Sequence, residues 1–156
     1  MKVYQLKTTQ ILPLSLKEAW LFFSNPANLS RITPGWLNFK TTSDLPEKMY
    51  AGMIVTYKVK PLLNIPQTWV TEITQVNEPY YFVDEQRFGP YKMWHHEHIF
   101  RENSDGELEM QDIVSYVLPF GFIGRIANKL LVRKKIEEIF SYRKKILEKI
   151  FPDKKA

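Results

Sequence analysis

The sequence contains no cysteine among its 156 residues. This absence excludes disulfide bonds, thiolate catalysis, thiol redox chemistry and every zinc site that uses cysteine ligands. Histidine and carboxylate side chains are then the only ligands left for a metal ion. Composition alone therefore removes several classes of enzyme.

Long apolar segments and catalytic loop motifs are also missing. No stretch approaches the ~18 consecutive apolar residues of a membrane-spanning helix, and the first ten residues lack the charged start and apolar run of a secretory signal. We therefore expect a cytoplasmic protein. The absence of a GxSxG motif and of glycine-rich phosphate loops gives no support to nucleophilic hydrolysis or nucleotide chemistry.

The length of the chain suits one domain over residues 1–156, with residues 151–156 as a basic tail. Hydrophobic residues make up 44% and charged residues 25%, which is typical of a globular protein and excludes general disorder. Aromatic residues reach 14%, so the fold has to accommodate many large rings.

Positive charge gathers in the last part of the chain. Residues 125–156 hold eleven Lys or Arg against four Asp or Glu, a net charge of +7, whereas residues 1–124 carry a net charge of −2. The favoured interpretation is a solvated helix face followed by a lysine tail. The alternative is a weak peripheral contact with an anionic membrane. We expect no nucleic-acid partner, and the pattern carries no information on oligomeric state.

Alternating apolar and polar residues, bounded by turn residues, predict an antiparallel meander of six or seven strands. The segments are Tyr4–Leu12, Trp36–Thr42, Met53–Lys60, Gln67–Val76, Tyr80–Phe88, Gly89–Phe100 and Glu107–Leu118. Of the connections, Asp44–Gly52 is rich in turn residues, and Pro61–Pro66 is either a mobile lip or a packed hairpin loop.

Two short helices are expected after the first strand. Ser15 with Glu18 forms a capping-box pattern that starts a helix over residues 15–25, and Pro26–Pro34 adds one or two turns. A long C-terminal helix follows Pro119. Its apolar residues change direction along the helix, which predicts either a bend near Leu130 or two halves that touch different surfaces.

All three histidines lie in the stretch Gly89–Phe100. Because side chains alternate along a strand, His96 and His98 share one face with Trp94, whereas His95 and Glu97 lie on the other. The first face therefore combines aromatic and polar groups. The face that carries His95 and Glu97 receives no predicted role.

The order of elements resembles the helix-grip fold of the START-like, or SRPBCC, superfamily. The strings ITPGWLNF from Ile32, FxDxQxxGPYxxWxHxH from Phe82 and DxVxYxLPFG from Asp112 resemble its bacterial polyketide cyclase/dehydrase-like branch. The resemblance implies an α+β fold in which a curved antiparallel sheet wraps a long C-terminal helix. It also implies a cavity between the two for an apolar or amphipathic ligand.

The residues expected to bind this ligand match the branch's pattern or are large rings of the cavity wall. They are Trp36, Trp69, Phe82, Asp84, Gln86, Trp94, His96, His98, Tyr116 and Phe120. For any one ring, ordinary core packing is the competing interpretation. The segment PFGFIGRIANKLL is interpreted as a lid whose apolar side faces the mouth of the cavity.

The polar residues of this set have three interpretations. The favoured one is a satisfied network that orients a ligand, since buried polar groups need partners. The second is an acid/base set of His96, His98, Asp112 and Tyr116 in a cyclase or dehydratase. The third is a metal held by His96, His98 and an aspartate. We predict binding of a lipid, quinone or polyketide-like compound, with no cofactor and no metal.

Overall fold

The computed structural model describes residues 1–61 and 65–153. Along the chain the elements are β1 (Tyr4–Leu12), α1 (Leu16–Phe23), η1 (Pro26–Ile32), η2 (Gly35–Leu37), β2 (Lys40–Thr41), β3 (Met53–Val59), β4 (Gln67–Asn77), β5 (Tyr81–Phe88), β6 (Met93–Glu102), β7 (Leu108–Val117), α2 (Gly121–Ala127), η3 (Asn128–Val132) and α3 (Arg133–Ile150). This is the predicted α+β order.

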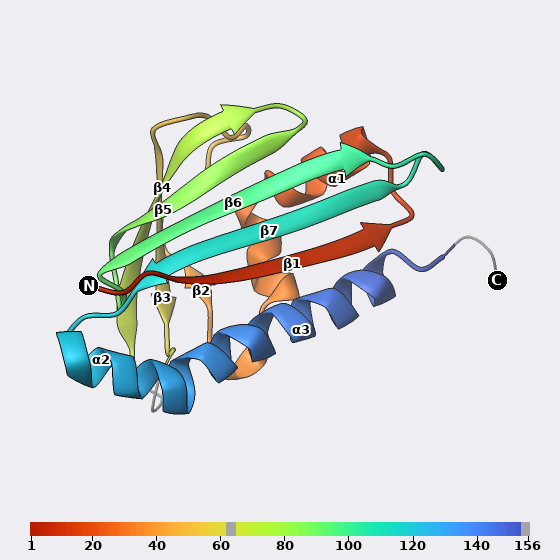
Figure 1. Ribbon diagram of the computed structural model, residues 1–156. Coiled ribbons are helices and arrows are strands. Elements are labelled where there is room, and N and C mark those ends of the chain that lie inside the picture. The colour runs from red at the N-terminus through yellow and green to blue at the C-terminus, as the bar shows by residue number, and fades with distance from the viewer. Residues whose placement is uncertain (62–64, 154–156) are drawn as a thin grey trace.

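Within those residues, seven strands form one antiparallel sheet in the order β1-β7-β6-β5-β4-β3-β2. Figure 1 shows the sheet bending round, with β2 and β3 behind the long strands and α3 running along the open side. Gln10 of β1 donates a hydrogen bond of 3.0 Å to the backbone carbonyl of Lys144, which ties β1 to α3. The helix-grip architecture predicted from the sequence is confirmed.

Local sequence explains the helices that lie between β1 and β2. The Ser15 hydroxyl accepts a hydrogen bond from the backbone N–H of Glu18, and the Glu18 carboxylate accepts one from the backbone N–H of Ser15, so the predicted capping box is present. Ala19 and Trp20 then face the core from α1. Pro26 begins η1, a helix of 3₁₀ type, as the proline position suggests.

One expectation about the start of the sheet is wrong. The predicted strand Trp36–Thr42 is reduced to Lys40–Thr41, because Trp36 and Leu37 belong to the 3₁₀ turn η2. Asn38 ends that turn in the left-handed conformation, with φ of 46°, which interrupts any extended segment. The predicted loop Pro61–Pro66 includes residues 62–64, which lie outside the described residues.

The C-terminal segment forms consecutive helical turns from Gly121 to Ile150, and η3 is a π-helical turn between α2 and α3. A π turn places an extra residue in the helix and rotates the faces on either side of it relative to each other. Ile136, Phe140 and Leu147 of α3 are therefore buried against the sheet, whereas Ile123 of α2 is exposed. This explains the change in apolar direction seen in the sequence.

A cluster of large rings packs α1 onto the sheet. The Phe100 ring is fully buried, and its centroid lies 5.4 Å from that of Phe23, 6.1 Å from that of Phe82 and 6.3 Å from that of Trp20. Edge-to-face and offset arrangements of this kind are favourable beyond the burial of their area.

We expect Phe100→Ala to lower the free energy of unfolding by about 3–5 kcal/mol, because it leaves a cavity among the three neighbouring rings. Phe88→Ala is the matched control, since Phe88 is 66% exposed, and we expect it to change the value by less than about 0.5 kcal/mol. Urea denaturation followed by tryptophan fluorescence measures both. Equal losses in the two variants would contradict this description of the core.

Candidate functional site

Two aspartates and two histidines meet on the concave face of the sheet. In the strand register, Asp84 of β5 is opposite His96 of β6, and His98 of β6 is opposite Asp112 of β7. Directly opposite side chains in an antiparallel pair lie on the same face at about 5 Å. The alternation along β6 then brings both pairs together, and we call Asp84, His96, His98 and Asp112 the Asp–His tetrad.

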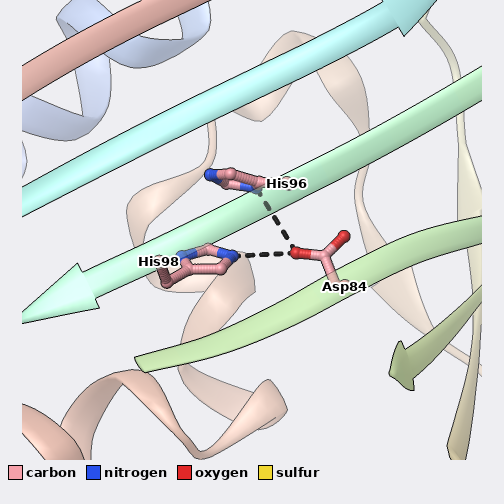
Figure 2. A group of neighbouring side chains, drawn as sticks. All are labelled: Asp84, His96 and His98. Atoms are coloured by element: carbon pink, nitrogen blue, oxygen red, sulfur yellow. Dashed lines mark hydrogen bonds and ion pairs between the residues drawn. The ribbon is translucent and has the colours of Figure 1, made fainter. Parts of the chain in front are cut away.

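Each imidazole of the tetrad lies between the two carboxylates. His96 Nε2 is 2.9 Å from Asp112 Oδ1 and His98 Nε2 is 2.8 Å from Asp84 Oδ2, both within hydrogen-bond distance. The other ring nitrogens make longer contacts, His96 Nδ1 at 3.3 Å from Asp84 Oδ2 and His98 Nδ1 at 3.2 Å from Asp112 Oδ1. Figure 2 shows both rings directed at the Asp84 carboxylate.

Burial and mutual pairing determine the charge of this group. Burial alone would raise the pKa of Asp84 and of Asp112, but hydrogen bonds from His96 and His98 and their charge outweigh it and hold both below the usual 3.8. For His96, burial lowers the pKa, and the hydrogen bonds to Asp112 and Asp84 reverse this and raise it above 6.5. The tetrad is therefore a buried, mutually neutralising ionic group.

Aromatic rings surround the tetrad. The His98 ring stacks on that of Phe82 with centroids 4.1 Å apart, and the His96 ring meets that of Phe140 edge-on at 5.6 Å. The two imidazoles lie 3.7 Å apart. These contacts exclude water and hold the rings in place while the carboxylates fix their rotation.

Asp84, His96 and His98 could also hold a divalent metal ion, because one ligand atom from each lies within 4.8 Å of the others. Two imidazoles and one carboxylate are ligands that suit zinc or non-haem iron. The same ring nitrogens already contact carboxylate oxygens, so an ion would have to displace those contacts. The absence of a metal, expected from the sequence, stays a prediction.

The tetrad forms part of the wall of a cavity of about 180 Å³ between the sheet, η1 and α3. Most of the lining is apolar, and Phe22, Leu29, Ile73, Trp69, Trp94 and Ile139 are among the residues that contribute to it. Polar groups are concentrated at the tetrad and at a few other positions. This is the usual composition of a small-molecule site, apolar with a few placed polar groups, at a volume below the typical range.

The structure places six of the ten predicted ligand-binding residues in this lining. They are Trp69, Phe82, Asp84, Trp94, His96 and His98, and Asp112 of the predicted catalytic set joins them. The prediction that His96 and His98 face inward is therefore correct in its geometry. Whether these residues contact a ligand stays a prediction.

Four predicted residues lie outside the lining, and each has a visible reason. The Gln86 side chain forms hydrogen bonds with the backbone N–H and carbonyl of Tyr91. The Tyr116 hydroxyl donates a 2.8 Å hydrogen bond to Asn128 Oδ1. Trp36 sits in η2 under Lys135, whose Nζ is 4.4 Å from the ring centroid. Phe120, immediately before α2, is 80% exposed.

Arg143 of α3 is the principal residue that the sequence prediction missed. It is buried, lines the cavity and was counted among the solvated basic residues of the C-terminal helix. A signal was present, because Arg143 lies seven residues after Ile136 and four before Leu147, on the apolar stripe of α3. Tyr57 and Tyr91 were also missed as lining residues, and burial raises the pKa of both phenols.

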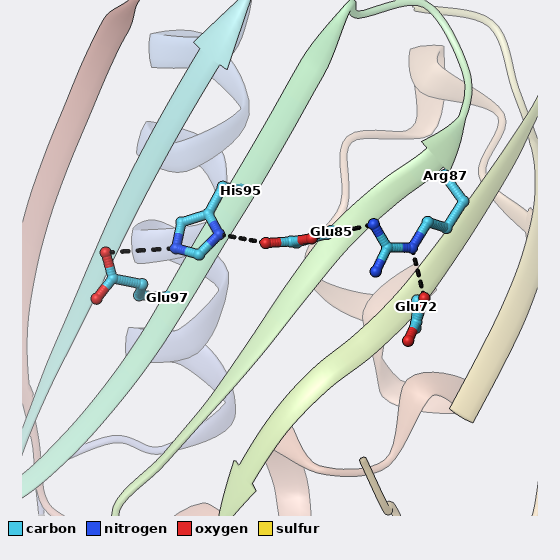
Figure 3. Close-up of polar contacts among 5 residues, drawn as sticks. All are labelled: Glu72, Glu85, Arg87, His95 and Glu97. Carbon is cyan, nitrogen blue, oxygen red and sulfur yellow. Dashed lines mark hydrogen bonds and ion pairs between the residues drawn. The ribbon is translucent and has the colours of Figure 1, made fainter. Parts of the chain in front are cut away.

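His95 belongs to a separate network on the opposite, convex face of the sheet, as the strand alternation predicts. Figure 3 shows a chain of polar contacts in which Arg87 links Glu72 and Glu85, and His95 links Glu85 and Glu97. His95 Nδ1 lies 2.8 Å from Glu85 Oε1. These side chains are partly exposed, so the network is a surface feature of the strands and takes no part in the cavity.

Comparison with solved structures identifies the fold. No family model matches the sequence, and no curated protein matches it. TTHA0849 from Thermus thermophilus is 14% identical with a TM-score of 0.68, covering 94% of this chain and 95% of that one.

Two further similar structures carry names that refer to biosynthesis or to an enzyme. The di-domain ARO/CYC protein BexL from the BE-7585A biosynthetic pathway is 12% identical with a TM-score of 0.73, over 97% of this chain and 51% of that one. A Thalictrum norcoclaurine synthase point mutant, in complex with a transition-state analogue, is 12% identical with a TM-score of 0.66, over 96% of both chains. At these identities the comparisons establish the helix-grip fold and leave the chemistry open.

We expect Asp112→Asn to lower the free energy of unfolding by about 3–5 kcal/mol at neutral pH, because it breaks a buried ionic group on one side. Asp105→Asn, at an exposed turn, is the control and should have little effect. The folded-state pKa of Asp112 is lowered, so its stabilisation is present above about pH 4 and is lost as the pH falls. The difference in unfolding free energy between Asp112→Asn and wild type should therefore become smaller as the pH falls. A difference that becomes larger would contradict the pairing of Asp112 with the histidines.

For His96 we predict the opposite dependence of the stabilisation on pH. Its folded-state pKa is raised, so the stabilisation from its charge is complete below the unfolded value of 6.5 and is lost as the pH rises through the folded value. The difference in unfolding free energy between wild type and His96→Gln should shrink as the pH rises above about 6.5. Urea denaturation over a series of pH values measures this. A difference that is constant or grows with pH would show that His96 is not a charged partner of the aspartates.

Proposed function

We propose that this protein binds a compact, largely apolar small molecule in the cavity between the sheet and α3. The observation that carries the proposal is the cavity itself, whose apolar wall contains one concentrated polar group, the Asp–His tetrad. The carboxylates and imidazoles of the tetrad are paired with one another, so an apolar molecule can lie beside them without breaking an ion pair. It would orient the polar end of a ligand.

Likeness in fold is consistent with this proposal. The norcoclaurine synthase with the same fold holds a bound transition-state analogue, and BexL acts in a biosynthetic pathway. Lipids, quinones and polyketide-like compounds are the classes expected from the sequence. The volume of about 180 Å³ favours small members of these classes, or one segment of a larger molecule.

The cyclase or dehydratase alternative has weaker geometric support. Tyr116, its expected proton donor, is buried outside the cavity lining and donates to Asn128. His96 and His98 line the cavity, but every ring nitrogen already contacts a carboxylate oxygen. A general base needs an available lone pair within reach of the substrate proton. Binding is therefore the function that this arrangement supports best.

Filling the cavity tests the proposal. We expect Ile139→Trp to weaken the binding of the uncharged single-ring probe cinnamyl alcohol, measured by isothermal titration calorimetry, by about tenfold or more, because the new ring occupies ligand space. Leu21→Trp is the control, since Leu21 is 65% exposed on α1. Circular dichroism confirms that both variants fold. Equal probe affinity in both variants and wild type would place the binding site elsewhere.

A second candidate function is docking to an anionic membrane surface, and one observation favours it. The lid prediction is wrong in its direction, because none of residues 119–131, which form the predicted lid, lines the cavity and their large apolar side chains are exposed. Phe122, Ile123 and Leu130 are 66–73% exposed, and with Phe120, Ile126 and Leu131 they form what we call the α2 patch. Exposed apolar groups gathered on one element commonly mark a contact surface.

The basic residues beside the α2 patch support a lipid surface as its partner. Arg125, Lys129, Arg133 and Lys134 are exposed in the same helical turns as the patch. An amphipathic helix with apolar residues beside basic ones is suited to lie in an anionic membrane interface. Leu118 and Val132, which flank this segment in the chain, line the cavity, so docking would bring the cavity wall close to the lipid. None of the helices of the described residues is long and apolar enough to cross a membrane.

Vesicle sedimentation tests the docking. We expect binding to vesicles that contain phosphatidylglycerol, weaker binding to pure phosphatidylcholine, and loss of binding as salt screens the basic residues. The double variant Phe122→Ser, Ile123→Ser should bind several-fold less, because it removes apolar side chains that would enter the interface. Leu21→Ser removes an equally exposed side chain on α1 and should have no effect. Unchanged binding by the double variant, or binding by neither protein, would reject this function.

A further inference from the structure

Arg143 is a buried cation without a charged partner in the described part of the chain. It is 8% exposed, and among residues 1–61 and 65–153 it makes no ion pair and no hydrogen bond, its Nε being enclosed and unpaired. The contact that the guanidinium does make is with the ring of Phe140, 4.8 Å from the ring centroid. Arginine stays charged in proteins, so this burial has a cost that only an anion or water can offset.

The carboxylates of the protein near Arg143 are already engaged. Asp84 and Asp112 contact the ring nitrogens of His96 and His98, and Glu137 of α3 accepts a 2.9 Å hydrogen bond from Arg133. Asp112 has one buried oxygen, Oδ2, without a partner, yet it lies beyond ion-pair distance of Arg143 within the described structure. Arg143 is therefore a buried charge of the cavity wall that has no ion-pair partner among the described residues.

We propose that Arg143 receives the carboxylate of the ligand, so that the cavity selects compact apolar acids. This inference rests on the proposed binding function and names the ligand class. A guanidinium presents two parallel N–H donors that match the two oxygens of a carboxylate, a pairing stronger and more specific than that of an ammonium. The charge pairing would also restore neutrality to the whole cavity.

The size of the cavity limits the apolar part of that acid. An apolar protein cavity of roughly 150 Å³ is known to accommodate benzene, and this one measures about 180 Å³. One aromatic ring or a short chain therefore fits, with the carboxylate at Arg143. On α3, Ile136 lies two turns and Ile139 about one turn before Arg143, which provides an apolar surface next to the cation. The phenols of Tyr57 and Tyr91 also line this space.

Cinnamate and cinnamyl alcohol form a matched pair of probes that differ in charge and share the ring. Isothermal titration calorimetry on the full chain should show that wild type binds cinnamate about tenfold or more tightly than the alcohol, as expected for a charge-assisted pair. Arg143→Met should lose this preference while keeping its affinity for the alcohol within about threefold. Arg143→Lys, which keeps the charge and loses the planar fork, should retain part of the preference.

Lys145→Met is the control, because it removes one positive charge from an exposed position two residues away and should keep the preference for the acid. Equal binding of acid and alcohol by wild type would overturn the role of Arg143 and leave the binding function standing. A preference that survives in Arg143→Met would also overturn it, because another group of the protein would then receive the carboxylate. Binding of neither compound would overturn this inference together with the proposed function.

Discussion

The structure depends on the neutralisation of two carboxylates that the fold removes from water. Asp84 lies on β5 and Asp112 on β7, the two strands that flank β6. The strand β6 supplies one histidine opposite each aspartate. A buried carboxylate without a partner would be strongly destabilising, so the sequence of β6 has to place imidazoles at two positions of one face. This requirement fixes the register of β5, β6 and β7, because a shift of one residue would turn His95 toward the aspartates and His96 toward solvent.

The same constraint shapes the cavity. The paired carboxylates and imidazoles of the sheet provide a polar surface, and the apolar residues of η1, β4 and α3 form the rest of the cavity wall. The buried Arg143 of α3 is not paired in this way, because it contacts the ring of Phe140 and has no counter-ion among the described residues. An anionic ligand group at that position would complete the neutralisation that the tetrad begins. The proposed ligand class therefore follows from charge, whereas the size limit follows from the enclosed volume.

Period-two alternation predicted much of the fold and which histidines share a face. Alternation separated His96 and His98 from His95, and the resemblance to the helix-grip fold assigned the first pair inward. The structure agrees, because a strand paired on both sides cannot change its faces without a bulge. Alternation does not show what covers a face. Tyr116 points to the same side of the sheet as Trp94, its neighbour in the register, but η3 covers it and Asn128 binds its hydroxyl. The Gln86 side chain bonds the backbone of Tyr91, just after the Gly89-Pro90 turn, and the sequence pattern could not indicate this contact.

The long-range features were the least predictable. The change in apolar phase along the C-terminal helix was visible in the sequence, but its cause, the π turn Asn128–Val132, and the outward direction of the α2 side chains depend on how the helix meets the sheet. Arg143 was misread because eleven basic residues were treated as one group, although its position on the apolar stripe distinguished it. A basic residue in phase with buried aliphatic residues indicates burial and a need for an anion.

The four tryptophans provide the most direct measurement of the central claim, that the cavity between the sheet and α3 is a binding site. Trp69 and Trp94 line it, whereas Trp20 is packed in the core and Trp36 lies in η2 outside it. In a ¹H–¹⁵N spectrum titrated with cinnamyl alcohol, which carries no charge, the indole signals of Trp69 and Trp94 should shift with one saturating dependence while that of Trp36 stays in place. Shifts confined to Trp36, or no shift at Trp69 and Trp94, would contradict the account.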